Sequence, residues 1–232
     1  MGKKLGIFLV SKNNYQLLPG WVDRVNIEGY EVLNIDEDST PENKEIGKKT
    51  CNDFNIHYMD REEKGLQNNI QSACDYFEKL GCEWVIAFQH DCYPMDNIFF
   101  DKFESIIETG KLDEFGVVGF NIHHDGIYQI LSRTPIQQPD QDMLVRVHIG
   151  TPIPTPYNKP HSVESVYWTA AAINIKQYNK YIIPTSDYQM FQAWDDVAFQ
   201  FLYNNIHNLV IPEFQMSHEQ VIKEKFDIPI KS

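Results

Sequence analysis

Two adjacent aspartates near the end of the chain have side chains that can take part in proton transfer. Asp195 and Asp196 stand side by side at the start of a helical apolar pattern. A carboxylate held beside a hydroxyl group can take its proton while a new bond forms. Two aspartates in the first turn of a helix also commonly satisfy its free backbone N–H groups. From the local pattern alone, helix capping is the simpler interpretation.

The run His123-His124-Asp125 is a second place where chemistry could be sought, because imidazole and carboxylate are both common metal ligands. The run has no partner in a His-x-x-x-His arrangement, which would put two imidazoles on one helical face. It also follows an apolar stretch that predicts a strand. Polar residues of a loop are therefore the simpler interpretation, and a metallohydrolase stays an alternative.

Short apolar runs separated by helical patterns are the elements that must position these side chains. The runs predict strands, and they lie at Leu5–Val10, Tyr30–Ile35, Trp84–Phe88, Phe115–Phe120 and Leu209–Ile211. Strands that alternate with helices favour an α/β fold built on one sheet.

Two helices are predicted from apolar residues at helical spacing. The first has its apolar face at Leu66, Ile70, Ala73, Phe77 and Leu80, and Gly81 stands where it should stop. The second begins at about Trp194, so that Asp195 and Asp196 fall in its first turn. Residues 133–164 are rich in proline and lack periodicity, which predicts a functional loop.

Length, apolar runs, net charge and cysteine spacing limit the classes of protein to which the chain can belong. The 232 residues suit one domain, and no apolar run approaches the roughly 20 residues of a membrane helix. The net charge of −13 disfavours a nucleic-acid partner, which would draw affinity from Lys and Arg. The four cysteines show no Cys-x-x-Cys spacing, so we expect a reducing, cytoplasmic setting.

Several segments stand in a recognisable order. The strand Leu5–Val10 ends in the polar turn Ser11-Lys12-Asn13-Asn14, and Tyr30–Ile35 ends in an acidic turn at Asp36–Thr40. Farther along are Glu63–Asn69, Phe88-Gln89-His90-Asp91 and Ala193-Trp194-Asp195-Asp196-Val197. This ordered set resembles the family 2 glycosyltransferases and their GT-A fold, a Rossmann-like mixed α/β sheet flanked by helices.

The resemblance implies a binding site for a nucleotide-sugar donor, expected to be a UDP-sugar. Val10 and Ser11 would open this site, and Asp36, with Asp38 nearby, would contact the base. A solvated turn whose Asp and Ser bond their own backbone is the alternative for that segment. Gly65 and Asn68 correspond to the family's Asn-x-Gly segment, which leads into a helix.

The metal site of the family reads Asp-x-Asp and holds the ion that bridges the donor's diphosphate. Asp91 matches the second aspartate, whereas Gln89 replaces the first. Oxygen ligands suit Mn²⁺ or Mg²⁺. His90 lies between them and is expected to line the cleft, and His218 resembles a histidine that often completes the metal site.

The resemblance assigns Asp196 as the catalytic base, with Asp195 in place of the preceding acidic residue. One base and direct displacement imply inversion at the anomeric carbon. Trp168 falls on the acceptor side, where it would stack on a sugar ring, with a core position as its alternative. One domain over residues 1–232 is expected, with a donor half to about residue 120 and an acceptor half from about residue 121.

The expected function is thus metal-dependent transfer of a sugar to the hydroxyl group of a glycan or another acceptor. A nucleotidyltransferase is a rival, but the turn Ser11–Asn14 lacks the Gly-rich phosphate-binding pattern. A binding module of the same fold without catalysis is a second rival, because Gln89 departs from the metal motif.

Overall fold

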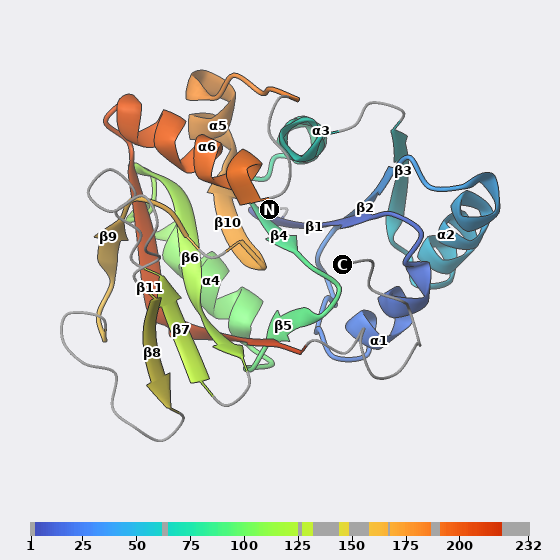
Figure 1. The fold of residues 1–232 in the computed structure, drawn as a ribbon, viewed down its shortest axis with the longest axis horizontal. Helices are drawn as coiled ribbons and strands as arrows, with labels where there is room; N and C mark the ends of the chain where they lie inside the picture. Colours follow the sequence, from blue (N-terminus) through green and yellow to red (C-terminus); the bar gives the residue numbers. More distant parts are fainter. Residues whose placement is uncertain are drawn as a thin grey trace.

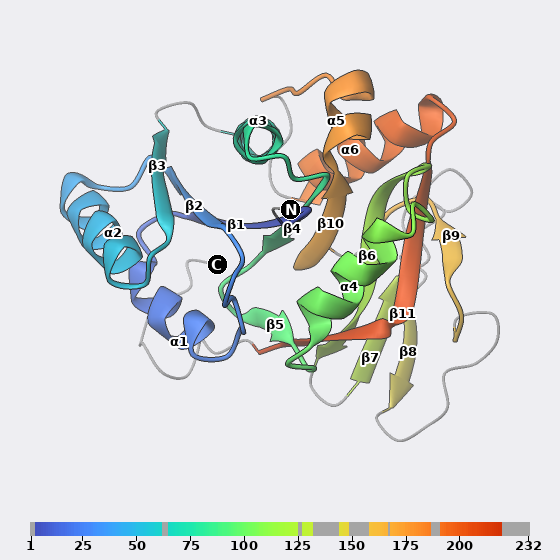
Figure 2. The same cartoon turned by 180° about the vertical axis from the view of Figure 1, so that it is seen from behind.

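A computed structural model describes residues 3–61, 65–124, 127–131, 144–148, 158–166, 168–186 and 191–219. These residues form one mixed sheet, with the strand order β3-β2-β1-β4-β10-β6-β11-β5. In addition, β7 pairs with β6 and β8, and β9 pairs with β11. Helices cover both faces, as Figures 1 and 2 show from opposite sides.

The strands of the first half are parallel neighbours. They are β1 (Leu5–Ser11), β2 (Val32–Glu37), β3 (His57–Arg61) and β4 (Trp84–Phe88), followed by the short β5 (Cys92–Pro94). The strands β1 and β4 are buried almost throughout, which is typical of parallel strands covered on both faces.

The strands of the second half join this sheet through β10. They are β6 (Phe115–His124), β7 (Ile127–Leu131), β8 (Leu144–His148), β9 (His161–Val163), β10 (Ala170–Asn174) and β11 (His207–His218). Strand β10 runs antiparallel to both β4 and β6, and β11 runs parallel to β6. Strands β1, β2, β4, β6 and β11 therefore all end at the same edge of the sheet.

The helices form two layers, one on each face. They are η1 (Tyr15–Leu17), α1 (Leu18–Val22), α2 (Pro41–Asp53), α3 (Leu66–Lys79), α4 (Phe99–Glu108), α5 (Ile175–Tyr181) and α6 (Phe191–Tyr203). One buried core lies between the sheet and α1, α2 and α4. A second core lies between the sheet and α3, α5 and α6, and these three helices lie together toward the top of Figure 2, with α1 on the opposite side of the sheet.

All five predicted strands and both predicted helices are present, and the α/β fold class is confirmed. Gly81 follows α3 with a φ of 82°, a left-handed conformation that suits glycine. Leu80 was expected on the buried face but is 49% exposed, because the helix has already ended there. Most of the proline-rich stretch 133–164 lies outside the described residues.

The start of α6 differs from the prediction. The helix begins at Phe191 and has no acidic residue in its first turn, so Asp195 and Asp196 lie farther along it. They therefore do not cap this helix, and the simpler of the two interpretations of the acidic pair is wrong.

Gly116 gives a test of how closely α6 packs on the sheet. A Cβ atom built at Gly116 would lie 2.4 Å from the ring of Phe201, which is fully buried on α6. We expect Gly116→Ala to lower the free energy of unfolding by about 1–3 kcal/mol through overpacking. Gly20→Ala is the matched control, since its Cβ meets nothing within 4 Å. Urea unfolding measures both, and equal stabilities would contradict the predicted overpacking.

Candidate active site

Most of the predicted site residues gather at the edge where the parallel strands end. Ser11 closes β1, and Gln89, His90 and Asp91 follow β4. His218 is the last residue of β11. In open α/β sheets, ligands bind outside the carboxyl ends of the strands. The topology thus brings residues from distant parts of the sequence to the edge where a ligand is expected.

The two predicted metal ligands, Asp91 and His218, are close to each other. His218 Nε2 lies 3.5 Å from Asp91 Oδ1, and both side chains are largely buried. Strand β5 explains the contact, because Cys92 pairs with His218. The backbone carbonyl of Asp91 also accepts a hydrogen bond from the N–H of Glu219, at 2.9 Å. The last strand therefore fixes the position of the predicted metal ligand from the first half.

His90 belongs to a chain of polar side chains that links the end of β4 with β1 and β2. Ser11 donates its single proton to Asn34 Oδ1 at 2.6 Å, so its oxygen accepts from His90 Nε2 at 3.0 Å. The other ring nitrogen, Nδ1, then accepts from the Asn14 amide at 3.4 Å. Burial lowers the pKa of His90 to about 4. His90 is therefore neutral, with both ring nitrogens bonded to the protein, as expected of a structural residue beside the predicted metal ligand Asp91.

Asp36, near the end of β2, forms hydrogen bonds within the turn that follows the strand. Asp36 has no exposed surface. It accepts a hydrogen bond from the N–H of Ser39 at 2.8 Å, and a short one from the hydroxyl of Tyr15. Asp36 thus bonds the backbone of its own turn, as the alternative for this segment expects, but Asp36 and Ser39 are buried, so the turn is not solvated as that alternative assumed. The predicted contact with a base would fall to half-buried Asp38, which adopts a φ of 59° beside it.

Glu37 connects the end of β2 with the start of α3, a contact that the sequence pattern does not reveal. Its Oε1 accepts from the N–H of Gly65 at 2.9 Å and from the amide of Asn69 at 3.2 Å. Gly65 precedes α3 with a φ of 120°, and Asn68 is half-buried in the first turn. Both residues predicted for the donor site thus lie on a turn that a carboxylate from β2 anchors.

The acidic pair of α6 is held by polar side chains from two sides. Asp196 Oδ2 accepts hydrogen bonds from the amides of Gln67 at 2.9 Å and Gln200 at 2.7 Å. Asp195 Oδ1 accepts from the hydroxyl of Ser165 at 2.7 Å. Both aspartates are half-buried, so each retains contact with solvent while its orientation is fixed.

Trp168 belongs to the core, which corrects the prediction that it stacks on a sugar ring. It is only 5% exposed and stacks on Trp194, with ring centroids 4.3 Å apart and an interplanar angle of 17°. Its indole N–H donates to Ser165 at 3.4 Å. Next to it, the carbonyl of Thr169 accepts from the N–H of Gln89 at 2.9 Å. Trp168 thus packs against α6 from within the core.

Among comparisons with known proteins, those with solved structures identify the fold. No protein-family model matches the sequence, and no curated protein matches it. Among solved structures, the mannosyltransferase PcManGT from Pyrobaculum calidifontis in complex with GDP-Man and Mn²⁺ superposes with a TM-score of 0.61 at 10% identity. The alignment covers 97% of this chain and 59% of that chain.

Two further solved structures superpose on most of this chain. GalNAc-T7 with UDP, GalNAc and Mn²⁺ gives a TM-score of 0.67 at 14% identity and covers 93% of this chain and 44% of that one. Glucosyl-3-phosphoglycerate synthase from Mycobacterium tuberculosis in complex with Mn²⁺, UDP and glucosyl-3-phosphoglycerate gives 0.55 at 10% identity, over 94% of this chain and 73% of that one. The chain has the GT-A fold. It spans about three-fifths of PcManGT and less than half of GalNAc-T7.

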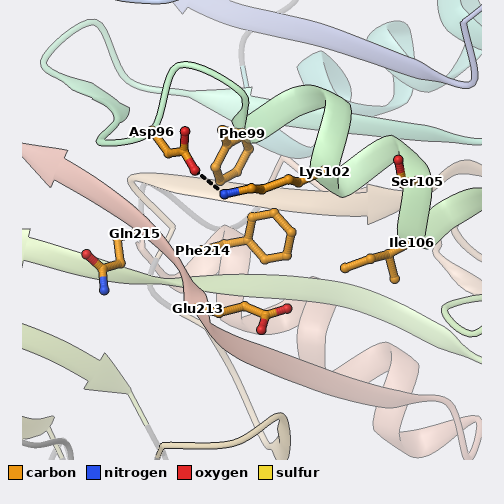
Figure 3. A pocket seen from close by; sticks show the side chains of 8 residues that line it. All are labelled: Asp96, Phe99, Lys102, Ser105, Ile106, Glu213, Phe214 and Gln215. Atoms are coloured by element: carbon orange, nitrogen blue, oxygen red, sulfur yellow. Dashed lines mark hydrogen bonds and ion pairs between the residues drawn. The ribbon is translucent and has the colours of Figure 1, made fainter.

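The GT-A fold of this chain also contains a cavity of about 430 Å³ between α4 and β11. Figure 3 shows its lining, in which Lys102 reaches across to Asp96, and the rings of Phe99 and Phe214 form an apolar wall. Phe99 and Phe214 belong to the core on the α4 side of the sheet. The cavity therefore lies on the face opposite α6 and its acidic pair.

Three further findings concern metal ligands, membrane-spanning helices and cysteines among the described residues. These residues contain no group of three or more His, Cys, Asp or Glu side chains that could hold a metal by themselves. They also contain no helix that is long and apolar enough to cross a membrane. The four cysteines are buried and not disulfide-bonded.

Proposed function

We propose that the chain is a metal-dependent glycosyltransferase that moves a sugar from a nucleotide-sugar donor to an acceptor hydroxyl group, with inversion at the anomeric carbon. The observation that carries the proposal is the contact between Asp91 and His218, formed at the carboxyl edge of a GT-A fold. The resemblance in sequence picks out the same two residues.

The donor set at this edge fits a divalent cation that a substrate helps to bind. Asp91 offers a carboxylate oxygen and His218 an imidazole nitrogen, and the two atoms are close enough to contact one ion. Mg²⁺ and similar ions usually take one or two protein carboxylates and complete their coordination with water and substrate phosphates. Two protein ligands therefore suffice, which accommodates Gln89 in place of the first aspartate. When bound, such a cation would offset the negative charge on a diphosphate leaving group.

The protein residues supply orientation and proton transfer. Gly65 and the first turn of α3, which Glu37 holds in place, are the proposed contacts of the donor. Asp196 is the proposed base, because its carboxylate is half-buried and oriented by two amides that cannot themselves take the proton. A base that acts on the acceptor from the face opposite the leaving group gives inversion. A UDP-sugar is the expected donor, since the structures of GalNAc-T7 and glucosyl-3-phosphoglycerate synthase contain UDP.

A screen of nucleotide sugars tests the proposal. The purified chain is incubated with each UDP- and GDP-sugar, with Mn²⁺ or with a chelator, and release of the nucleoside diphosphate is measured. We expect release that depends on Mn²⁺ and accelerates with a hydroxyl-bearing acceptor. Metal-dependent binding of nucleoside diphosphates with no release would instead favour a non-catalytic binding module, for which Gln89 is the motivating observation.

A further inference from the structure

Asp196 receives hydrogen bonds from two glutamines that come from different elements. Gln67 lies in the first turn of α3, and Gln200 lies one helical turn after Asp196 on α6. Both amides donate to the same oxygen, Oδ2. Hydrogen bonds to a charged acceptor are shorter and stronger than neutral ones, so this oxygen is the anchored end of the carboxylate.

The other end of each glutamine amide is anchored to one backbone segment. Gln67 Oε1 accepts from the N–H of Thr185 at 2.8 Å, and Gln200 Oε1 accepts from the N–H of Ile183 at 2.8 Å. Each amide thus bridges the carboxylate of Asp196 and the segment after α5. We call Gln67 and Gln200 the glutamine clamp.

Gln67 is the more strongly fixed member of the clamp. It has no exposed surface. Its amide nitrogen also donates to the carbonyl of Ala193 at 2.8 Å, and its backbone carbonyl accepts from the hydroxyl of Tyr178 at 3.1 Å. Because a buried amide is costly unless it is hydrogen-bonded, these contacts allow one orientation of the side chain. That orientation presents an N–H to Asp196.

We propose that the glutamine clamp positions Asp196 for catalysis, with Gln67 as its principal positioning residue. The inference rests on the proposed function. The clamp holds Oδ2 in place and leaves the second carboxylate oxygen, Oδ1, to accept the proton from the acceptor hydroxyl. Gln67 also connects this base to the donor side, because Gly65, two residues earlier, is bonded to Glu37 of β2.

A matched pair of variants separates positioning from ordinary stabilisation. Gln67→Met removes the amide with little change in size. Asn208→Leu is the control, because Asn208 is also fully buried and bonds α6 through the carbonyl of Ala198 at 3.0 Å, without contacting Asp196. We expect both variants to melt at lower temperature. Only Gln67→Met should lower kcat, by about 10–100-fold, since small misplacements of a catalytic group cost up to about 100-fold, while the KM for the donor stays close to wild type.

A double-mutant cycle shows whether Gln67 acts through Asp196. In the Asp196→Asn background, Gln67→Met should cause no further loss of kcat. An equal loss in both backgrounds, or an equal loss from Asn208→Leu, would overturn the positioning role. If Gln67→Met does not fold, the partly exposed Gln200→Met gives the same comparison.

A structural measurement keeps the test independent of activity. In a crystal structure of Gln67→Met, or of Gln200→Met, the carboxylate of Asp196 should leave its single orientation and occupy more than one rotamer. An unchanged single rotamer would refute the clamp. An inactive wild-type chain would count against the proposed function alone, since the rotamer measurement still decides the clamp.

Discussion

Replacing Asp196 by asparagine is expected to lower turnover by about 10²–10⁴-fold, the usual contribution of general-base catalysis. Asparagine has nearly the size of aspartate, and its carbonyl oxygen can still accept from the glutamine clamp. What it loses is the ability to take a proton. The dissociation constant for the nucleotide sugar should hardly change, because the base acts on the acceptor. Transfer kinetics and isothermal titration with the donor measure the two quantities.

Stability provides the control for this variant. Asp196 does not lie in the first turn of α6, so no helix cap is lost and the melting temperature should stay close to that of the wild type. Asp195→Asn is the matched comparison, since that carboxylate is bonded to Ser165. Full turnover in Asp196→Asn together with a large loss in Asp195→Asn would move the base to Asp195.

Replacing Asp91 by asparagine is expected to remove most of the metal-dependent donor binding. Loss of a partner of a metal ligand typically costs about 10–100-fold in metal affinity, so loss of the proposed carboxylate ligand itself should cost more than about 100-fold. The fold should remain, because the hydrogen bond from Glu219 uses the backbone carbonyl of residue 91. Titration of a nucleoside diphosphate with and without Mn²⁺, and Mn²⁺ binding followed by electron paramagnetic resonance, measure the loss.

Asp96→Asn is the control for Asp91→Asn. Asp96 is an acidic residue only a few positions later, where it pairs with Lys102 beside the cavity on the α4 side. It should leave the metal-dependent affinity at the wild-type value. Equal metal-dependent affinities in Asp91→Asn and wild type would show that Asp91 is not a metal ligand. His218 would then lack the second ligand proposed for the site.

Elements with strong apolar patterns could be predicted from the sequence, and weaker ones could not. Trp84–Phe88 is entirely apolar and matches β4 residue for residue. In contrast, β3 has the sequence HYMDR and lies at an edge of the sheet with polar residues exposed, so it carries no strand pattern. Strand β10 begins with three alanines, which have low strand propensity. Helix α2 buries only Gly47 and Cys51, too few residues for an apolar stripe.

The candidate site could be predicted only where single residues stand at the ends of strong elements. Asp91 follows the apolar strand β4, and His218 is the last residue of β11. The resemblance indicated both residues, and their meeting at one edge is a consequence of topology. The glutamine clamp has no comparable signal, because amide hydrogen bonds between Gln67 and Asp196 depend on how α3 and α6 pack. Trp168 shows the opposite error, since a tryptophan beside a predicted site can equally be a core residue.

The contact between Asp91 and His218 makes the proposed metal site dependent on completion of the sheet. Strand β11 must pair with both β6 and β5 before the two side chains can meet, so this part of the site depends on pairings between residues far apart in the sequence. Such non-local pairings generally form slowly, because the cost of closing the intervening chain is paid first. During refolding, manganese-dependent nucleotide binding should therefore recover late, when β11 has docked. Helix signals should recover before it.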